Sequence, residues 1–278
     1  MKTITGSLLF LLLLIGIVFW TGPALLLATF HKIDGRFLAL MLSALVFADL
    51  LRAYKYRTAL KGIVPFRETF RLFLYSKLTG FVSAEKAGER IPLLHTHERK
   101  KEIAAFLMAD RAFEALTLFF LGAFGFALFS SSLAVYLVGG VLLGLAILLV
   151  VLLYRRNGHL TQFLGTLRDN TASFRAFLVT ALALTITAAV ADLFALQLLL
   201  KSTGAVTTLS FLAFACMASG LAGFASSFPS GLGVSDTVLA VMLSTYGIAR
   251  AAMGVTVALH RGITLVKSTL YYRLLVFL

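Results

Sequence analysis

The sequence SFPSGLGVSDTVLAV, at residues 227–241, places a proline, two glycines and an aspartate in one of the most apolar regions of the chain. Proline and glycine destabilise the interior of a helix, so we expect the helix to break at Phe228–Val234. Asp236 follows this break directly, and a carboxylate in apolar surroundings needs water or a charged partner. The stretch therefore predicts two helical segments joined at a turn beside a buried acid.

The composition identifies the apolar surroundings as a lipid bilayer. Hydrophobic residues make up 60% of the 278 residues and charged residues 13%, whereas soluble domains contain about half and about a quarter. Several runs approach or exceed the roughly 20 apolar residues that span a bilayer core. These runs are Leu8–Phe30, Phe37–Leu51, Ile103–Phe129, Leu133–Tyr154, Ala176–Leu200, Val206–Phe228 and Ala251–Leu278. We expect an all-α, polytopic integral membrane helix bundle with about 6–8 spanning helices, formed by one domain over residues 1–278.

The net charge of +13 would suggest a nucleic-acid partner in a soluble protein, but in a membrane protein lysine and arginine collect in cytoplasmic loops. Most of the excess lies in the segments Arg52–Lys101 and Arg155–Arg175. Both fall on one side if Leu8–Phe30 is a retained first helix with its N-terminus inside, which leaves His31–Arg36 and Lys201 outside. We therefore expect a multi-pass cell-membrane protein with cytoplasmic N- and C-termini, basic loops against anionic headgroups, and no nucleic-acid partner.

Two regions are too interrupted to be simple spans. Residues 65–94 are first amphipathic and then apolar for too few residues to cross, which predicts an interfacial or re-entrant helix. In Val206–Gly247, either two helices cross with the turn at a surface, or two half-helices enter and leave on one side with the turn buried. Ala84–Arg90 and Pro229–Asp236 both carry a glycine at the fifth position and an acid after it. This echo is either an internal repeat, as in many transporters, or a coincidence.

Three charges lie inside the apolar run Ile103–Phe129. On a helix, Asp110 and Glu114 share a face because they are four residues apart, and Arg111 and Glu114 can pair because they are three apart. A helix that starts near Ile103 places them about 10–16 Å into the bilayer, where a charge must face protein or water. They form either a salt bridge that fixes helix packing or part of a polar translocation path.

The last run places Arg261 near the centre of a helix over Ala251–Phe277, so this arginine needs an acidic partner. The candidates are Asp110, Glu114, Asp192 and Asp236, among which the sequence does not choose. Asp192 is the lone acid of its run and is equally consistent with an ion pair or a polar cavity. Asp49, close to Arg52, is expected at a helix end.

Enzyme chemistry has little support in the sequence. His95 and His97 lie in a basic stretch without a second group of ligands, so no metal site is predicted. The chain has no Gly-rich phosphate loop with a following lysine, no zinc-protease helix motif and no Gly-X-Ser-X-Gly elbow. Cys216, the single cysteine, is expected to pack between helices. We therefore expect no enzymatic activity, no catalytic residues, no metal and no cofactor.

Three motifs occur in a characteristic order: Gly88-Glu89 after the amphipathic segment, Asp110-Arg111 with Glu114, and Phe228–Asp236 before a short helix. Together they resemble the lysylphosphatidylglycerol synthase transmembrane-region family. This family is the flippase-like membrane part of the bacterial multiple peptide resistance factor and also occurs as stand-alone proteins. The resemblance extends from about Leu51 to Lys267.

The chain also departs from the family pattern. Ala84 stands where a proline is common, Asp236 stands where glutamate is common, and Arg90 follows Glu89 directly. Lysyl transfer to lipid is not expected, because the sequence contains no soluble aminoacyltransferase domain.

The resemblance implies a polytopic fold with re-entrant helices around a polar cavity, and movement of a lipid headgroup across the bilayer. It implies a set of residues that bind the headgroup or line the cavity. These are Glu89, Arg90, Asp110, Arg111, Glu114, Pro229, Gly231, Gly233, Asp236 and Arg261. The physical properties of the residues agree, since helix N-termini and arginines bind phosphate and acids bind cations or protons.

The leading hypothesis is a lipid translocase, either a flippase or a scramblase-like carrier, for an anionic phospholipid or a polyprenyl-phosphate lipid. The alternatives are a non-transporting membrane partner of a lipid-modifying or glycosyl-transferring enzyme, and a secondary transporter of a small solute. Membrane lipids are the expected partners, with a lipid-modifying enzyme or a second copy of the chain as further candidates. We predict that Asp236 lies beside the Pro229–Gly233 turn and faces the protein interior, in one cavity with Glu89 or Arg111.

Overall fold

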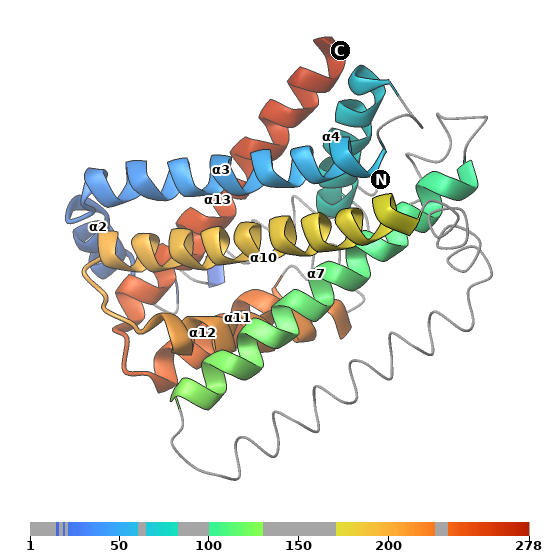
Figure 1. Ribbon diagram of the computed structural model, residues 1–278. Helices are drawn as coiled ribbons and strands as arrows, with labels where there is room; N and C mark the ends of the chain where they lie inside the picture. Colours follow the sequence, from blue (N-terminus) through green and yellow to red (C-terminus); the bar gives the residue numbers. More distant parts are fainter. Residues whose placement is uncertain are drawn as a thin grey trace.

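The computed structural model describes residues 22–60, 65–82, 100–129, 171–225 and 233–277, and the isolated positions 15, 16 and 19. Across these residues the chain forms eight helices and no strand (Figure 1). The helices are α2 (Pro23–His31), α3 (Gly35–Ala59), α4 (Phe66–Val82), α7 (Lys100–Phe129), α10 (Thr171–Ser202), α11 (Leu209–Ala225), α12 (Val234–Thr245) and α13 (Arg250–Phe277). The described part of the chain confirms the predicted all-α bundle.

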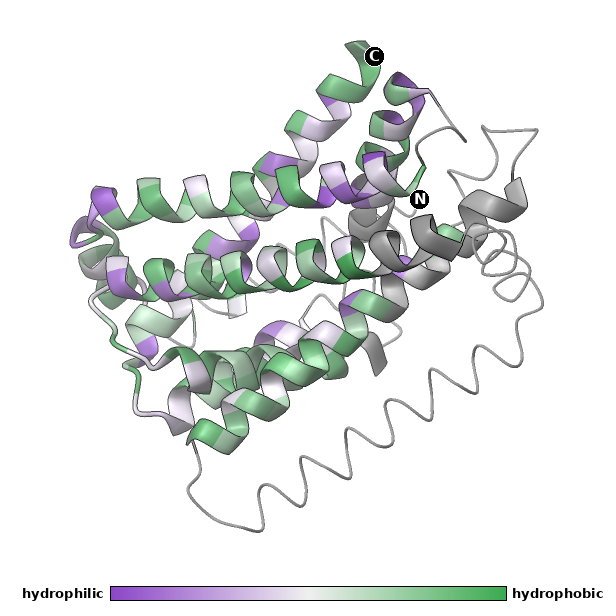
Figure 2. Ribbon diagram, viewed as in Figure 1, coloured by the Kyte–Doolittle hydropathy of each residue, from purple (hydrophilic) through white to green (hydrophobic). Residues whose placement is uncertain are grey.

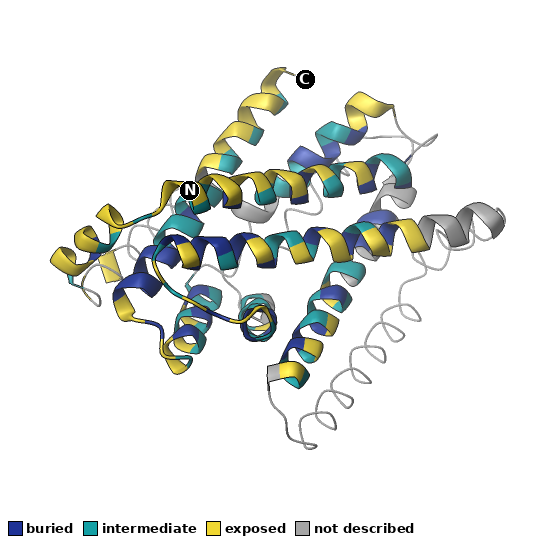
Figure 3. Cartoon of the chain, turned by 60° about the vertical axis from the view of Figure 1, so that its left-hand side comes forward, coloured by how far each residue is buried: buried dark blue, intermediate teal, exposed yellow. Residues whose placement is uncertain are grey.

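Helices α3 and α10 lie side by side and antiparallel (Figure 1). The Asp34 N–H donates to the Ser202 carbonyl at 3.0 Å, so the start of α3 meets the end of α10. Both helices contain a segment long and apolar enough to cross a membrane, Gly35–Ala59 and Val179–Ser202. Their outer sides are hydrophobic and exposed (Figures 2 and 3). Such a continuous exposed apolar surface suits contact with lipid acyl chains.

Helix α3 continues beyond the predicted end of its apolar run. The expectations that Asp49 lies at a helix end and that Arg52 belongs to a basic loop are both wrong, because the helix ends at Ala59. Asp49 lies about 15 Å before that end, at 1.5 Å per residue. Arginine and lysine are good helix formers, and here acids on neighbouring helices neutralise them, so the charges do not end the helix.

Helices α7 and α11 pack closely through glycines. A Cβ atom on Gly122 would collide with the Met217 side chain. A Cβ atom on Gly125 would collide with the Ser210 carbonyl and would lie 2.8 Å from the Ala213 Cβ. Glycines of this kind allow two membrane helices to approach each other closely.

Helices α11 and α12 form an antiparallel hairpin on either side of the Pro/Gly break. The rings of Phe211, near the start of α11, and Tyr246, after the end of α12, stack with centroids 4.2 Å apart. Further along the hairpin, the Ser219 hydroxyl donates to the Ser235 carbonyl at 2.8 Å. The start of α11 and the end of α12 therefore lie at the same end of the bundle.

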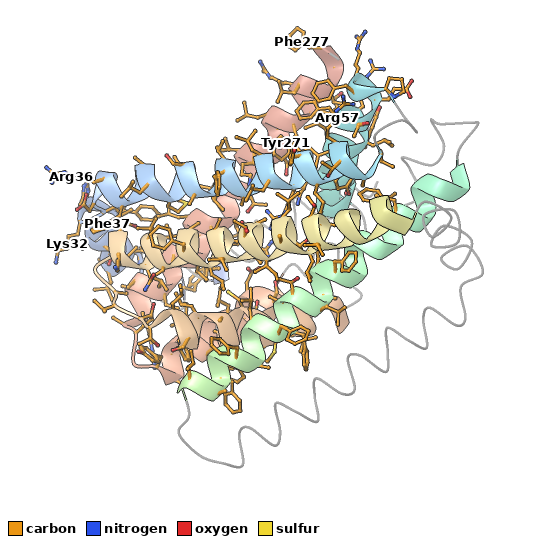
Figure 4. All side chains as sticks on the ribbon, viewed as in Figure 1. Lys32, Arg36, Phe37, Arg57, Tyr271 and Phe277 are labelled. Carbon is orange, nitrogen blue, oxygen red and sulfur yellow. The ribbon has the colours of Figure 1, made fainter. Side chains whose placement is uncertain are left out.

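A hydrophobic core joins this hairpin to the start of α3 and the end of α10. Its buried members include Met41, Leu196, Leu199, Leu212, Leu243 and Met253. Helix α13 begins beside this core and runs to the opposite end of the bundle (Figure 1). Figure 4 shows the two ends: Lys32, Arg36 and Phe37 lie at one, and Arg57, Tyr271 and Phe277 at the other.

Helix α4 packs against α3 and α13 at the end that carries Arg57. The Tyr56 ring meets Phe73 and Phe106 edge to face at 5.6 and 4.9 Å, and the Arg57 guanidinium lies 5.1 Å from the centre of the Phe66 ring. The first part of the predicted amphipathic segment is thus a helix. Residues 83–99, including the Ala84–Arg90 echo, and the predicted span Leu133–Tyr154 lie outside the described residues.

Candidate functional site

The first charged group in the interior, called here the α12 cluster, consists of Gly233, Ser235, Asp236 and Arg261. The Arg261 Nε donates to both carboxylate oxygens of Asp236, at 2.8 and 2.9 Å, and Nη2 donates to the Ser235 hydroxyl at 3.0 Å. Asp236 and Arg261 are only 5% and 8% exposed. A buried pair of this kind is stable only because each charge is neutralised by the other and hydrogen-bonded.

The backbone at the start of α12 explains why the sequence places glycine and aspartate there. Gly233 has φ +84°, a left-handed conformation that glycine adopts without strain. Its N–H donates to the Asp236 Oδ2 at 3.2 Å, so the acid also closes the N-terminus of its own helix. A carboxylate in the first helical turn is further stabilised by the helix dipole.

The α12 cluster lies deep in the bundle. Arg261 is about 16 Å from the start of α13 at 1.5 Å per residue. The Ser219 hydroxyl, about 15 Å along α11, donates to the Ser235 carbonyl beside the ion pair. The prediction that Asp236 lies beside the turn residue Gly233 and faces the interior is confirmed. Asp236 is also the partner of Arg261 that the sequence could not select.

The second group, called here the α3 cluster, joins four helices. It consists of Asp49, Arg52, Lys55, Asp110, Glu114, Asp192, Lys267 and Tyr271. Lys55 is only 1% exposed and forms an ion pair with Asp110, which is 4% exposed. Its ammonium also lies 3.9 Å from the Glu114 carboxylate and donates to the Thr185 hydroxyl at 3.1 Å. Lys55 thereby connects α3 to α7 and α10.

Arg52, one turn earlier on α3, contacts three carboxylates. It forms an ion pair with Asp192 of α10, and lies 3.5 Å from Asp49 and 3.9 Å from Glu114. Asp49 also accepts from Lys267 and from the Tyr271 hydroxyl, both on α13. Among the described residues the cluster therefore combines four carboxylates with three cations across α3, α7, α10 and α13.

A small polar pocket opens beside the α3 cluster, between α3, α4 and α7. Its lining combines cations, acids and hydroxyl groups: Arg52, Tyr56, Ser76, Lys77, Asp110 and Glu114. The Tyr56 hydroxyl donates to the Ser76 hydroxyl at 3.1 Å, which ties α3 to α4 on one wall. This lining can hydrogen-bond water or a polar ligand group, which the apolar outer surface cannot do.

Residues 5–270 match the family model described as the lysylphosphatidylglycerol synthase TM region. The chain belongs to this family. The match places the apolar helices in a transmembrane region and makes the chain a membrane protein related to lipid handling. A search of curated proteins and a search of solved structures each found no match.

In this member of the lysylphosphatidylglycerol synthase transmembrane family, the predicted site residues fall into two separate places. Gly233, Asp236 and Arg261 meet in the α12 cluster, whereas Asp110 and Glu114 belong to the α3 cluster. Four predicted residues lie outside the described ones: Glu89, Arg90, Pro229 and Gly231. Asp236 was predicted to share a cavity with Glu89 or Arg111. Glu89 lies outside the described residues, and Arg111 lies in α7 with its side chain outside the described part. The shared cavity therefore stays a prediction.

Arg52 and Lys55 lie in the interior of the bundle, although they were predicted to belong to a basic loop. A signal for them exists: Asp49, Arg52 and Lys55 recur every three residues, so they share one face of a helix that extends the apolar run. Acids at Asp110 and Asp192 in other runs provide their partners. Assigning the segment Arg52–Lys101 to a cytoplasmic loop concealed this pattern.

The two clusters are connected along one side of α13. Between Arg261 and Lys267 the helix rises about 9 Å. Six polar side chains between His260 and Tyr271 fall within an arc of about 120° around the helix axis. The residues on this arc are His260, Arg261, Thr264, Lys267, Ser268 and Tyr271. Helix α13 thus carries a polar stripe from the α12 cluster to the α3 cluster, in which Arg261 is buried and the other residues are partly exposed.

Proposed function

We propose that the protein is a lipid translocase that moves an anionic phospholipid or polyprenyl-phosphate headgroup across the membrane without acting as an enzyme. The observation that carries the proposal is the polar stripe of α13, which joins the buried α12 cluster to the partly buried α3 cluster inside an apolar bundle. A headgroup cannot cross hydrocarbon without polar contacts, whereas its acyl chains can stay in lipid beside the bundle. The stripe supplies arginine and lysine for the phosphate, and the acids of the two clusters that it joins, such as Asp236 and Asp49, can bind a cation or proton.

The short helix α12 supports a re-entrant arrangement of the hairpin. Its 12 residues rise only about 18 Å, less than the roughly 30 Å of a bilayer core. It begins beside the middle of α13 and ends at the same end of the bundle at which α11 starts. We therefore propose that the break lies at membrane depth, where it is covered by protein, so that its backbone groups face the headgroup path.

The proposed orientation places the end that carries Arg57 and the C-terminal part of α13 in the cytoplasm. The basic segment 83–101 enters α7 at this end, and the basic segment 155–170 enters α10 there. The opposite end has the short 32–34 connection between α2 and α3. The excess of lysine and arginine in the longer segments favours this side as the cytoplasmic one.

The proposal is tested with the full chain reconstituted into vesicles that carry a fluorescent phosphatidylglycerol or a polyprenyl phosphate in both leaflets. Wild-type protein is expected to expose the inner-leaflet label to an external quencher faster than empty vesicles do. Arg261→Gln, which removes the buried guanidinium, is expected to lower the rate at least about tenfold. Arg250→Gln removes an exposed arginine from the first residue of the same helix and serves as the matched control.

Equal rates for wild-type and empty vesicles with every lipid tested would refute the translocase and favour a partner or solute-transport role. Equal transport rates for wild type and Arg261→Gln would show that transport does not depend on the α12 cluster. In that case the stripe along α13 would not be the route of the headgroup.

A further inference from the structure

We propose that Asp236 is a resident anion that competes with the phosphate of the lipid headgroup for Arg261, and so keeps the α12 cluster closed until the phosphate displaces it. The proposal deepens the translocase function and rests on it. Arg261 then binds the phosphate and Asp236 acts as the gate. The presence of the ion pair alone would not distinguish these two roles.

The Arg261 guanidinium makes fewer hydrogen bonds than it can donate. A guanidinium carries five N–H donors on three nitrogens. Nε serves both oxygens of Asp236 and Nη2 serves the Ser235 hydroxyl, while within the described residues Nη1 has no hydrogen-bond partner. The side chain is 9% exposed, and among the described residues Nη1 is not one of the fully buried polar atoms without a partner, so this nitrogen is accessible to an incoming ligand. Phosphate oxygens suit such donors, since guanidinium groups bind phosphate through paired hydrogen bonds.

The existing ion pair involves a single nitrogen of the Arg261 guanidinium. Both oxygens of Asp236 approach the same nitrogen, Nε, instead of pairing with two nitrogens of the fork. A ligand that offered oxygens to Nη1 and Nη2 would form the paired arrangement that Asp236 does not form. The resident carboxylate is therefore a weaker partner for Arg261 than a well-placed phosphate.

Asp236 has further favourable contacts at the N-terminus of α12, besides its ion pair with Arg261. The Gly233 N–H already donates to Oδ2 at 3.2 Å, and the first turn of α12 stabilises a carboxylate through the helix dipole. The Ser219 hydroxyl holds the Ser235 carbonyl from α11, so α12 stays attached when the ion pair opens. When Arg261 turns to a phosphate, Asp236 thus keeps the Gly233 N–H and the N-terminus of α12 as favourable partners.

The α3 cluster lacks these properties. Arg52 contacts three carboxylates, and Lys55 lies within 4 Å of two. A phosphate that approached Arg52 would meet several negative charges, whereas at Arg261 it meets one. Lys267 also contacts one carboxylate, Asp49, but Asp49 is shared with Arg52 and with the Tyr271 hydroxyl. Within the described residues, Arg261 is therefore the cation of the two clusters that an anion can reach by displacing a single acid with no other cationic partner.

The test measures equilibrium binding to the purified full chain in detergent, with short-chain phosphatidylglycerol in one arm and inorganic phosphate in the other. Asp236→Asn removes the competing charge and is expected to bind at least about tenfold more tightly than wild type, because juxtaposed like charges cost several kcal/mol. Arg261→Gln is expected to lose the tight binding. Asp34→Asn makes the same charge change at the exposed N-terminus of α3, outside both clusters, and is expected to bind like wild type.

The two arms identify the source of the phosphate. Tighter binding of phosphatidylglycerol alone assigns the site to a lipid headgroup, and tighter binding of both ligands assigns it to phosphate in general; either supports the competition. Asp236→Asn that folds normally by circular dichroism and binds both ligands no more tightly than wild type would overturn it. If the asparagine variant does not fold, Asp236→Ser keeps an acceptor for the Gly233 N–H and carries the same expectation.

The binding and transport measurements can refute the competition and the translocase function separately. Tighter binding by Asp236→Asn together with no transport by wild type would leave the competition standing and remove the translocase. Normal transport together with unchanged binding would remove the competition alone.

Discussion

The buried pair of Lys55 and Asp110 gives a sharp test of how the α3 cluster holds the bundle together. Asp110→Asn keeps the size of the side chain but leaves the Lys55 ammonium, 1% exposed, without its ion-pair partner. Removing one member of a buried pair costs about 3–5 kcal/mol. Glu114 at 3.9 Å and the Thr185 hydroxyl at 3.1 Å still contact Lys55. We therefore expect a loss at the lower end, about 3 kcal/mol.

The double variant Lys55→Met/Asp110→Leu distinguishes the contribution of the ion pair to stability from the contribution of side-chain packing. Replacing a buried ion pair by apolar residues of similar volume is often neutral or stabilising. We expect the double variant to unfold within about 1 kcal/mol of wild type, although Lys55→Met alone costs about 3–5 kcal/mol because it leaves Asp110 charged and buried. The loss in the double variant is then far smaller than the sum of the two single losses.

The measurement is the thermal unfolding of the full chain in detergent, at equal protein and detergent concentrations. For large domains 1 kcal/mol corresponds to about 2–4 °C, so Asp110→Asn should lower the midpoint by roughly 6–12 °C. Lys32→Met, which removes an exposed lysine at the other end of the bundle, is the control and should shift it little. Single variants as stable as the control, or a double variant as unstable as the sum, would refute the electrostatic account.

Two further predictions follow from the packing and the orientation. Gly125→Leu should destabilise the chain by at least about 1–3 kcal/mol, because its side chain collides with α11. Gly262→Leu, at a position with nothing within 4 Å of the added Cβ, should not, and equal melting temperatures of the two variants would contradict the close α7–α11 contact. Single cysteines at Lys32 and Arg273 in a Cys216→Ala background should react with a membrane-impermeant maleimide from the outside and from the cytoplasm, respectively. Labelling of both from the same side would refute the proposed topology.

Much of the architecture follows from local properties of the sequence. The lengths of the apolar runs predict membrane helices, and α7, α10, α11 and α13 all lie within or around predicted runs. Proline and glycine predict the break before α12, because their effect on the backbone does not depend on distant residues. The same reasoning predicts that Asp236 is buried and that Arg261 needs an acid, since a lone charge in hydrocarbon is too costly.

The chain alone did not determine which charges meet. Arg261 and Asp236 are 25 residues apart and Arg52 and Asp192 are 140 apart, so their distances are set by helix packing and not by spacing along one helix. The positions of Arg52 and Lys55 depend on the same packing. Beyond the apolar run, α3 remains helical with one face buried, because α7 and α10 bring Asp110 and Asp192 against it. A membrane bundle with a broken helix and interior charges therefore follows from the local sequence. The pairing of those charges follows from helix packing, because a buried ion pair depends on distances of a few ångströms between helices that are far apart in the chain.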